Sequence, residues 1–156
     1  MLSITDKLHR EIDVLLFDGA NILDLAGPVQ AFKSALIAKK RAYGLRFVSV
    51  DGQAVRACCG HGLKPNAKTE LSQAHSKTPR DLLVPGGAGV AAALTNTALR
   101  ALIEGWSHQH PEGRVTAVCS GALLLANSGV LDGKPTTPTG HESAKLPIIS
   151  PRSYWT

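Results

Sequence analysis

The chain has 156 residues, of which 44% are apolar and 19% are charged. Because a domain averages about 150 residues, this length and composition predict one globular domain and exclude a disordered, collagenous or coiled-coil chain. The 17 Lys and Arg residues outnumber the 12 Asp and Glu residues, for a formal net charge of +5, but they are scattered, whereas a nucleic-acid surface needs a basic patch or stripe.

The sequence also excludes a membrane-spanning protein, a disulfide-stabilised protein and a zinc-binding protein. No apolar run approaches the roughly 18 residues of a membrane-spanning helix, and residues 1–10 lack the apolar segment of a signal peptide. We therefore expect a cytoplasmic protein without membrane association. The three cysteines make no disulfide framework, and no Cys and His pair has zinc-binding spacing. We predict no metal and no cofactor.

The N-terminal part of the chain predicts a strand followed by a helix. An apolar run with β-branched members over 12–17 is typical of a buried strand. A loop over 18–21 follows it, and an Ala-rich segment then predicts a helix from Gly27-Pro28 to about Arg41, with proline at its start.

The next segment predicts a β-hairpin. Residues 45–50 alternate between apolar and polar side chains, as a half-buried strand does. The pair Asp51-Gly52 follows directly and is typical of a tight hairpin turn. Residues 53–59 are then expected to return as the second arm.

Two further strand, loop and helix units complete the predicted domain. The expected strands cover 81–84 and 114–118, and the expected helices cover 90–94, 98–108 and 122–127. Three such units in succession predict an α/β fold in which helices cover a mainly parallel sheet.

The chain changes character at Lys134-Pro135. Residues 136–156 contain three prolines and fit no regular element. Tyr154 and Trp155 lie at the extreme end, where large aromatic side chains are unusual unless the terminus docks. We predict that residues 135–156 form an irregular tail.

Three loops of the predicted sheet are expected to meet in one crevice. In a parallel sheet, ligands bind outside the carboxyl ends of the strands. The loops that leave these ends cover 18–24, 85–89 and 119–121. The candidate functional residues therefore come from these three segments.

Cys119 is the main candidate because it stands between a predicted strand and a predicted helix N-terminus. Such a position is exposed on a sharp turn, and the helix dipole favours a thiolate there. A thiolate is both nucleophilic and oxidisable. The alternative is a small buried apolar residue, which is the role we expect for Cys58 and Cys59 in the hairpin arm.

The glycine loop after the second predicted strand offers backbone amides. Gly86 and Gly87 would present N–H groups to a developing oxyanion, and the amide of Ser120 would be a further donor. The alternative is a tight turn whose glycines supply positive φ angles.

Asp24 is a lone acid among apolar neighbours, and it leaves two interpretations open. It either caps a helix N-terminus or points into the crevice. In the second case it would share a proton with the thiolate or act as a general acid or base.

A Cys–His dyad is not predicted. Ser120, rather than a histidine, follows Cys119. The histidines at 61, 75, 108 and 110 fall in connections or at a helix end, where surface positions are expected, and His141 lies in the predicted tail.

Four ordered motifs resemble the ThiJ/PfpI superfamily over residues of about 11–134, the predicted domain. The resemblance implies a flavodoxin-like (class I glutamine amidotransferase-like) three-layer sandwich and a homodimer that forms near the cysteine. The motifs are Ile12–Gly19 with Leu23–Pro28, Phe47–Ser49 with Asp51-Gly52, Leu82–Gly87, and Val118–Ala122 with Gly129–Lys134.

The Leu-Asp-Leu-Ala-Gly-Pro and Val-Cys-Ser-Gly-Ala forms are similar to two branches of that superfamily. In the isocyanide hydratase type, the acid that matches Asp24 works beside the nucleophile that matches Cys119, with the hydroxyl residue that matches Ser120 nearby. The other branch is the small-molecule-sensing domain that precedes the DNA-binding module of AraC-type transcription regulators.

The C-terminal part departs from the family pattern. Where the family usually continues with Thr-Thr-His-Trp, Thr136-Thr137 is followed by Pro138, so the expected histidine is missing. The likeness fades beyond Leu146, which implies a C-terminally truncated fold without its last strand and helix. We expect no helix-turn-helix, and hence no specific DNA binding by this chain.

Three functional hypotheses follow. In the first hypothesis the protein is an enzyme. Cys119 attacks an electrophilic carbon or orients water with Asp24, while the amides of Gly87 and Ser120 stabilise the developing charge. This is hydratase (lyase) or hydrolase chemistry on a small molecule. In the second, the same crevice binds a small-molecule ligand without turnover. The third is an inactive remnant of either.

Overall fold

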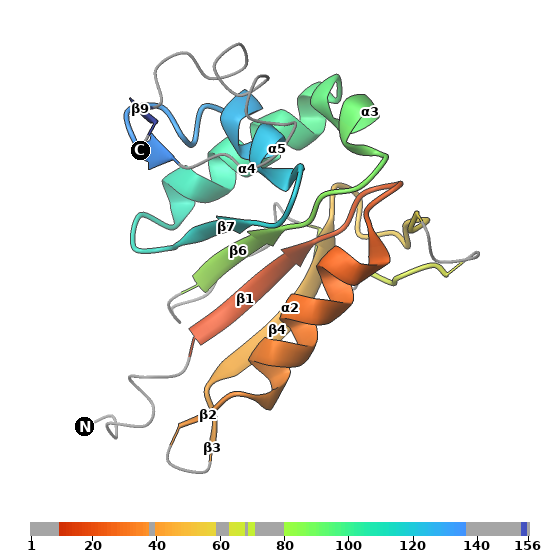
Figure 1. Ribbon diagram of the computed structural model, residues 1–156, viewed down its shortest axis with the longest axis vertical. Helices are drawn as coiled ribbons and strands as arrows, with labels where there is room; N and C mark the ends of the chain where they lie inside the picture. The colour runs from red at the N-terminus through yellow and green to blue at the C-terminus, as the bar shows by residue number, and fades with distance from the viewer. Residues whose placement is uncertain are drawn as a thin grey trace.

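The computed structural model describes residues 10–37, 40–58, 63–67, 69–70, 80–136 and 154–155. Figure 1 shows its elements along the chain. They are β1 (Arg10–Leu15), α2 (Ile22–Ser34), β2 (Leu36–Ile37), β3 (Lys40–Arg41), β4 (Tyr43–Ser49), β5 (Thr69–Glu70), β6 (Arg80–Val84), α3 (Val90–Leu94), α4 (Thr97–Gln109), β7 (Val115–Ala117), α5 (Gly121–Asn127), β8 (Pro135–Thr136) and β9 (Tyr154–Trp155).

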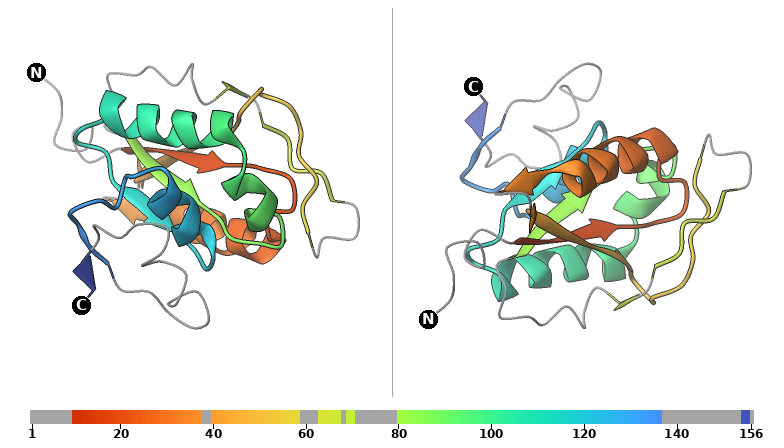
Figure 2. Two further views of the ribbon diagram at one scale, coloured as in Figure 1. Left: turned by 90° about the horizontal axis from the view of Figure 1, so that it is seen from above. Right: turned by 90° about the horizontal axis from the view of Figure 1, so that it is seen from below.

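A parallel sheet forms the centre of the molecule. Its five strands follow the order β5-β4-β1-β6-β7, and each neighbouring pair is parallel. Helix α4 covers one face, and α2 and α5 cover the other (Figure 2). The predicted α/β fold is confirmed as a three-layer sandwich, and the strand order around β1 is the one found in flavodoxin-like folds.

The core lies where the central strands meet the helices. β6 is buried along its whole length, and β1 from Ile12 onward, as expected of parallel strands covered on both faces. The buried apolar side chains that the helices contribute include Leu25 of α2, Leu99, Ile103 and Trp106 of α4, and Leu123, Leu124 and Leu125 of α5.

The predictions for the second half of the chain are largely confirmed. The strands predicted over 81–84 and 114–118 correspond to β6 and β7, and the three predicted helices correspond to α3, α4 and α5. Each of these segments has a strong local pattern of apolar residues between clear stop signals, and each is bordered by a glycine or a polar cap.

The first helix lies earlier than predicted. α2 begins at Ile22 because Asn21 is its N-cap, with Oδ1 accepting a hydrogen bond from the N–H of Leu23 at 2.9 Å. Pro28 lies inside the helix rather than at its start, and the helix ends at Ser34. The residues that follow form the antiparallel pair β2 and β3 instead of a further helical turn.

The predicted hairpin is wrong, although its first strand is present as β4. The chain does turn at Asp51-Gly52, where the Ser49 hydroxyl donates to the Asp51 carboxylate and to the carbonyl of Gln53. However, β4 pairs in parallel with β1 and β5. Residues 53–57 leave the sheet, and their backbone instead bonds to residues 63–65.

Little of the predicted tail lies within the described residues. Pro135-Thr136 and Tyr154-Trp155 pair in parallel as β8 and β9, so a short regular element exists where the sequence predicted none. The other residues of the tail lie outside the described part of the chain.

A buried carboxylate joins the central elements. Both oxygens of Asp13 in β1 accept hydrogen bonds from Arg46 of β4, at 2.9 Å each. Arg80 of β6 donates to Oδ1 at 2.7 Å, and the indole N–H of Trp106 donates to Oδ2 at 2.9 Å. One side chain thus connects the central strand to both neighbouring strands and to α4.

Asp81 forms a second ion cluster near the sheet surface. Arg10 and Arg114 both donate to its carboxylate, and so does the backbone N–H of Arg114 at 3.0 Å. Partial burial acts to raise the pKa of Asp81, but the hydrogen bonds from Arg114 and Arg10 outweigh it and lower the pKa to about 2. The carboxylate therefore stabilises the folded chain.

Replacing Asp81 with Asn is expected to lower the free energy of unfolding at pH 7 by about 1–2 kcal/mol, because the Arg114 side chain is 61% exposed and solvent screens the pair. The carboxyl titrates near pH 2 when folded and near about 4 when unfolded, so its contribution is present above the unfolded pKa and is lost as the pH falls through 2.

Urea unfolding at pH 7 and pH 3 tests this expectation. The difference between wild type and Asp81→Asn should fall to about half at pH 3. Glu104→Gln, which removes an exposed carboxylate of α4, serves as the control and should change little at either pH. A difference for Asp81→Asn that is the same at both pH values would contradict the assignment.

Candidate functional site

Cys119 occupies a sharp turn between β7 and α5. Its φ angle is +54°, which is in the left-handed region, and within the described residues it is the only non-glycine residue with a positive φ. Such a conformation costs roughly 1–3 kcal/mol and is concentrated at functional sites. The side chain is exposed, as the sequence predicted for a strand-to-helix turn.

Gly121 allows this turn to pack against the end of β6. A Cβ atom at this position would overlap the carbonyl oxygen of Val84 and would lie 2.7 Å from that of Pro85. Both atoms belong to the backbone, so neither can move aside as a side chain does. The first turn of α5 therefore lies directly on the carboxyl end of β6.

Asp24 and Ser120 hold the glycine loop between them. The carboxylate of Asp24 accepts a hydrogen bond from the N–H of Gly86 at 3.1 Å, and the hydroxyl oxygen of Ser120 accepts one from the N–H of Gly87 at 3.2 Å. A Cβ atom on Gly86 would lie 2.8 Å from Ser120 Oγ and 2.9 Å from Asp24 Oδ2. The three predicted loops do meet, and they meet at this backbone.

The structure changes what is expected of the two glycine amides. Both were candidate donors to an oxyanion, but in this structure the N–H of Gly86 bonds to Asp24 and the N–H of Gly87 bonds to Ser120. An oxyanion at Gly87 would have to displace the Ser120 hydroxyl. Asp24 does not cap α2, since Asn21 is the capping residue, and its carboxylate faces the backbone N–H of Gly86 instead.

Asn21 is a site residue that the sequence reasoning missed. Besides capping α2, it donates its backbone N–H to the carbonyl of Gly86 at 2.8 Å. It thereby fixes the β1–α2 loop to the glycine loop from the other side. Its signal was the pattern Asn21-Ile22-Leu23-Asp24, a capping residue followed three positions later by an acid.

The other candidate residues do not join Cys119. His108 and His110 lie at the C-terminal end of α4, near the amino end of β6, where Gly113 contacts the carbonyl of Arg80. Cys58 is half-buried and forms an isolated bridge with Asn21. Cys59, His61, His75 and His141 lie outside the described residues.

The described part of the chain contains neither a cluster of metal ligands nor a helix that could span a membrane. No group of three or more His, Cys, Asp or Glu residues there is placed to hold a metal ion. No helix among those residues is long and apolar enough to cross a bilayer.

Comparison with known proteins identifies the family. The model of the DJ-1/PfpI family matches residues 10–155, and the chain belongs to this family. The crystal structure of a DJ-1 superfamily protein from Agrobacterium tumefaciens superposes with a TM-score of 0.73, at 21% identity, over 94% of this chain and 73% of that one. The resemblance and the flavodoxin-like fold that it implied are confirmed.

Two known proteins are related to this chain by sequence as well as by fold family. An uncharacterized protein in the cpoL 5′ region of Streptomyces lividans is 33% identical over 138 residues, which cover 88% of this chain and 92% of that protein. The HTH-type transcriptional regulator GbdR of Pseudomonas aeruginosa is 30% identical over 126 residues, or 80% of this chain. The matched region spans 32% of the regulator's length.

The close packing at Gly121 gives a matched pair of glycine substitutions. Gly121→Ala is expected to lower the free energy of unfolding by about 1–3 kcal/mol, because the new methyl group meets backbone atoms of Val84 and Pro85. Gly105→Ala, in α4 with nothing within 4 Å of its Cβ position, is expected to raise it by about 0.5–1 kcal/mol.

Urea unfolding of both variants measures this contrast. Both substitutions add one methyl group to a helical glycine, so helix propensity alone would move them in the same direction. If Gly121→Ala were as stable as Gly105→Ala, α5 would not lie as close to β6 as described.

Proposed function

We propose that this protein is a cysteine-dependent enzyme that adds water to a small electrophilic molecule, with isocyanide hydratase-like chemistry. The observation that supports the proposal is the exposed Cys119 at φ +54°, next to the glycine loop that Asp24 and Ser120 hold. A sulfur exposed on such a turn can be reached by a substrate from solvent.

The proposed reaction converts an isocyanide and water into an N-substituted formamide. The Cys119 thiolate forms a bond to the terminal carbon, and that carbon takes a proton from Asp24, which gives a thioimidate. Water then adds to the C=N carbon while Asp24 accepts one of its two protons, which restores the protonated acid. The second water proton moves from the new hydroxyl group to the nitrogen through solvent, and the C–S bond breaks to release the thiolate and the formamide. The same groups would hydrolyse an activated amide-like substrate.

In this proposal Asp24 and Ser120 have different roles. Asp24 binds the N–H of Gly86 through Oδ2, and we assign proton transfer to its other oxygen. The Ser120 hydroxyl positions the glycine loop through the N–H of Gly87, and the backbone N–H of Ser120 is a donor for developing charge at the start of α5.

Turnover of cyclohexyl isocyanide to N-cyclohexylformamide tests the enzyme proposal. Cys119→Ala is expected to abolish turnover, and Asp24→Asn to lower kcat by about 10²–10⁴-fold through loss of acid–base catalysis. Cys58→Ala is the matched control and should leave kcat unchanged. Iodoacetamide labelling from pH 4 to 9, located by mass spectrometry, should modify the exposed Cys119 before the half-buried Cys58.

Two outcomes would contradict the enzyme proposal. One is turnover that survives Cys119→Ala. The other is labelling in which the three cysteines react alike, because a formed turn at Cys119 should distinguish its sulfur from the others.

The second candidate is a small-molecule-sensing domain without turnover. The observation that favours it is the 30% identity to the regulator GbdR, of which the matched region is only 32%. In this case the crevice binds a ligand, and a DNA-binding module elsewhere would read the result. For both candidates we propose a cytoplasmic homodimer, as the resemblance to the family implies.

Thermal unfolding with a panel of metabolites distinguishes the candidates. A sensing domain is expected to be stabilised by a ligand that is recovered unchanged, to an extent that grows with the logarithm of ligand concentration, about 2.7 kcal/mol at 100 times Kd. The stabilisation should persist in Cys119→Ala. A ligand that is consumed by wild type but not by Cys119→Ala would point back to the enzyme.

A further inference from the structure

The first turn of α2 and Gly86 form a closed set of hydrogen bonds. The N–H of Asn21 donates to the carbonyl of Gly86 at 2.8 Å, and the N–H of Gly86 donates to Asp24 Oδ2 at 3.1 Å. Gly86 is buried, and both of its backbone polar groups are therefore bonded to residues of one helix terminus. The position of the Asp24 carboxylate depends on Gly86 and on the helical turn that joins Asp24 to Asn21.

Asp24 occupies the position from which an acid ordinarily completes a capping box. α2 begins at Ile22, so Asp24 is its third residue. A carboxylate at this position usually accepts the backbone N–H of the N-cap residue, which here is Asn21. In this structure that N–H donates to Gly86, and the N–H of Gly86 donates to Asp24. Gly86 thus lies between the two partners of an ordinary capping box.

The side chain of Asn21 keeps the Asp24 carboxylate available for Gly86. The first N–H groups of a helix have no partner within the helix and need other acceptors. Asn21 Oδ1 accepts one of them, the N–H of Leu23, at 2.9 Å. Without this oxygen the N–H of Leu23 would need another acceptor, and Asp24 is the acidic residue of the first turn. Its carboxylate would then leave Gly86 for part of the time.

We infer that Asn21 is a positioning residue for the proposed reaction. By capping α2 through its side chain, Asn21 holds the carboxyl group of Asp24 against Gly86. The Cys119 turn is joined to the same glycine loop, because the Ser120 hydroxyl accepts the N–H of Gly87. The effect of Asn21 on turnover rests on the proposed function, whereas its effect on the bond between Asp24 and Gly86 does not.

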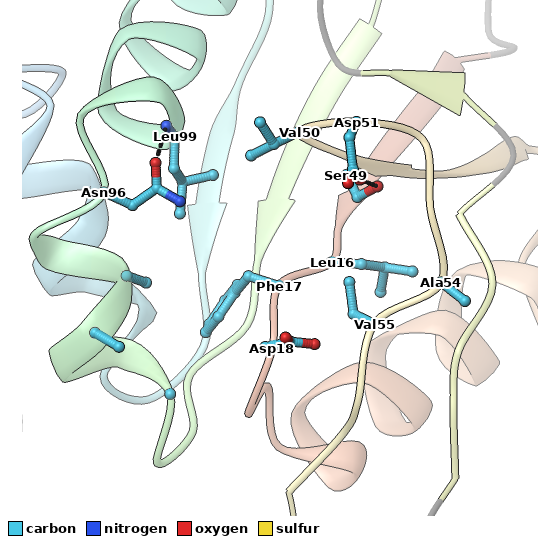
Figure 3. A pocket seen from close by; sticks show the side chains of 13 residues that line it. Leu16, Phe17, Asp18, Ser49, Val50, Asp51, Ala54, Val55, Asn96 and Leu99 are labelled. Atoms are coloured by element: carbon cyan, nitrogen blue, oxygen red, sulfur yellow. Dashed lines mark hydrogen bonds between the residues drawn. The ribbon is translucent and has the colours of Figure 1, made fainter.

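The chain contains a matched asparagine cap in another helix. Asn96 caps α4, and its Oδ1 accepts a hydrogen bond from the N–H of Leu99 at 3.0 Å (Figure 3). The backbone bonds of Asn96, with Ala93 and Arg100, stay within α3 and α4. Asn96→Ala therefore removes the same kind of cap as Asn21→Ala and leaves the bonds of Asp24 in place.

Hydration of cyclohexyl isocyanide tests the effect on the reaction. Asn21→Ala is expected to lower kcat by about fivefold to tenfold and to keep KM within about twofold of wild type, because a displaced acid affects proton transfer more than binding. Asn96→Ala should leave kcat and KM unchanged. Asn21→Ser keeps an oxygen that can cap the helix and should recover most of the lost kcat.

Amide hydrogen exchange of the ¹⁵N-labelled chain measures the bond between Gly86 and Asp24 without any turnover. The N–H of Leu16 bonds to the carbonyl of Val48 at 2.7 Å, so its exchange rate reports the stability of the sheet. The ratio of the Gly86 rate to the Leu16 rate is expected to rise about fivefold in Asn21→Ala. It should stay at the wild-type value in Asn96→Ala and return close to that value in Asn21→Ser.

The two measurements separate this inference from the proposed function. Wild-type turnover with equal kcat in Asn21→Ala and Asn96→Ala would overturn the inference and leave the proposed enzyme intact. A fall of kcat in Asn21→Ala with an unchanged exchange ratio would also overturn it, because Asp24 would not have moved.

Absence of turnover in the wild type would contradict the proposed enzyme, and the exchange ratio would then decide alone. A rise confined to Asn21→Ala would support the positioning of Asp24 by Asn21. An equal ratio in Asn21→Ala and Asn96→Ala would overturn it.

Discussion

The register of the central strands depends on the carboxylate of Asp13. This side chain is fully buried, and its partners are Arg46, Arg80 and Trp106. A buried charge is tolerated only when it is paired and hydrogen-bonded, and removal of one partner leaves the other uncompensated. Arg80 is only 6% exposed. A shift of β6 or β4 along β1 would therefore leave the buried charges of Asp13 and Arg80 without their partners. The ion cluster therefore disfavours every register but one.

That register decides which loops meet at the opposite edge of the sheet. β1 and β6 end side by side, so the loop that leads to Asp24 in the first turn of α2 and the glycine loop begin next to each other. β7 pairs with β6, which brings Ser120 to the other side of Gly86. The candidate site is thus held largely by backbone atoms: two glycine amides bond to two side chains, one from the first turn of α2 and one from the N-cap of α5. The pairing of the strands in the sheet therefore fixes the positions of the residues in the candidate site.

The sequence predicts those parts of this arrangement that local pattern determines. The strand at 81–84, the helix at 98–108 and the position of Cys119 each follow from an apolar run with its own boundaries. The second hairpin arm was wrong because Asp51-Gly52 specifies a turn but not the strand that pairs next. The start of α2 was misplaced because the cap at Asn21 outweighs the proline signal at Pro28. Local sequence pattern cannot predict the hydrogen bonds that the N–H groups of Gly86 and Gly87 donate, because the acceptors lie 62 and 33 residues away in the chain.

The left-handed backbone at Cys119 also bears on how this position is maintained. This conformation destabilises an L-residue with a Cβ atom by roughly 1–3 kcal/mol, whereas glycine adopts it without that steric cost. A glycine there would give a more stable chain without a sulfur atom. Thermodynamic optimisation alone would therefore remove the cysteine, and ordinary stabilising mutagenesis would favour its loss. Residue 119 is a place where stability and chemistry compete for one side chain.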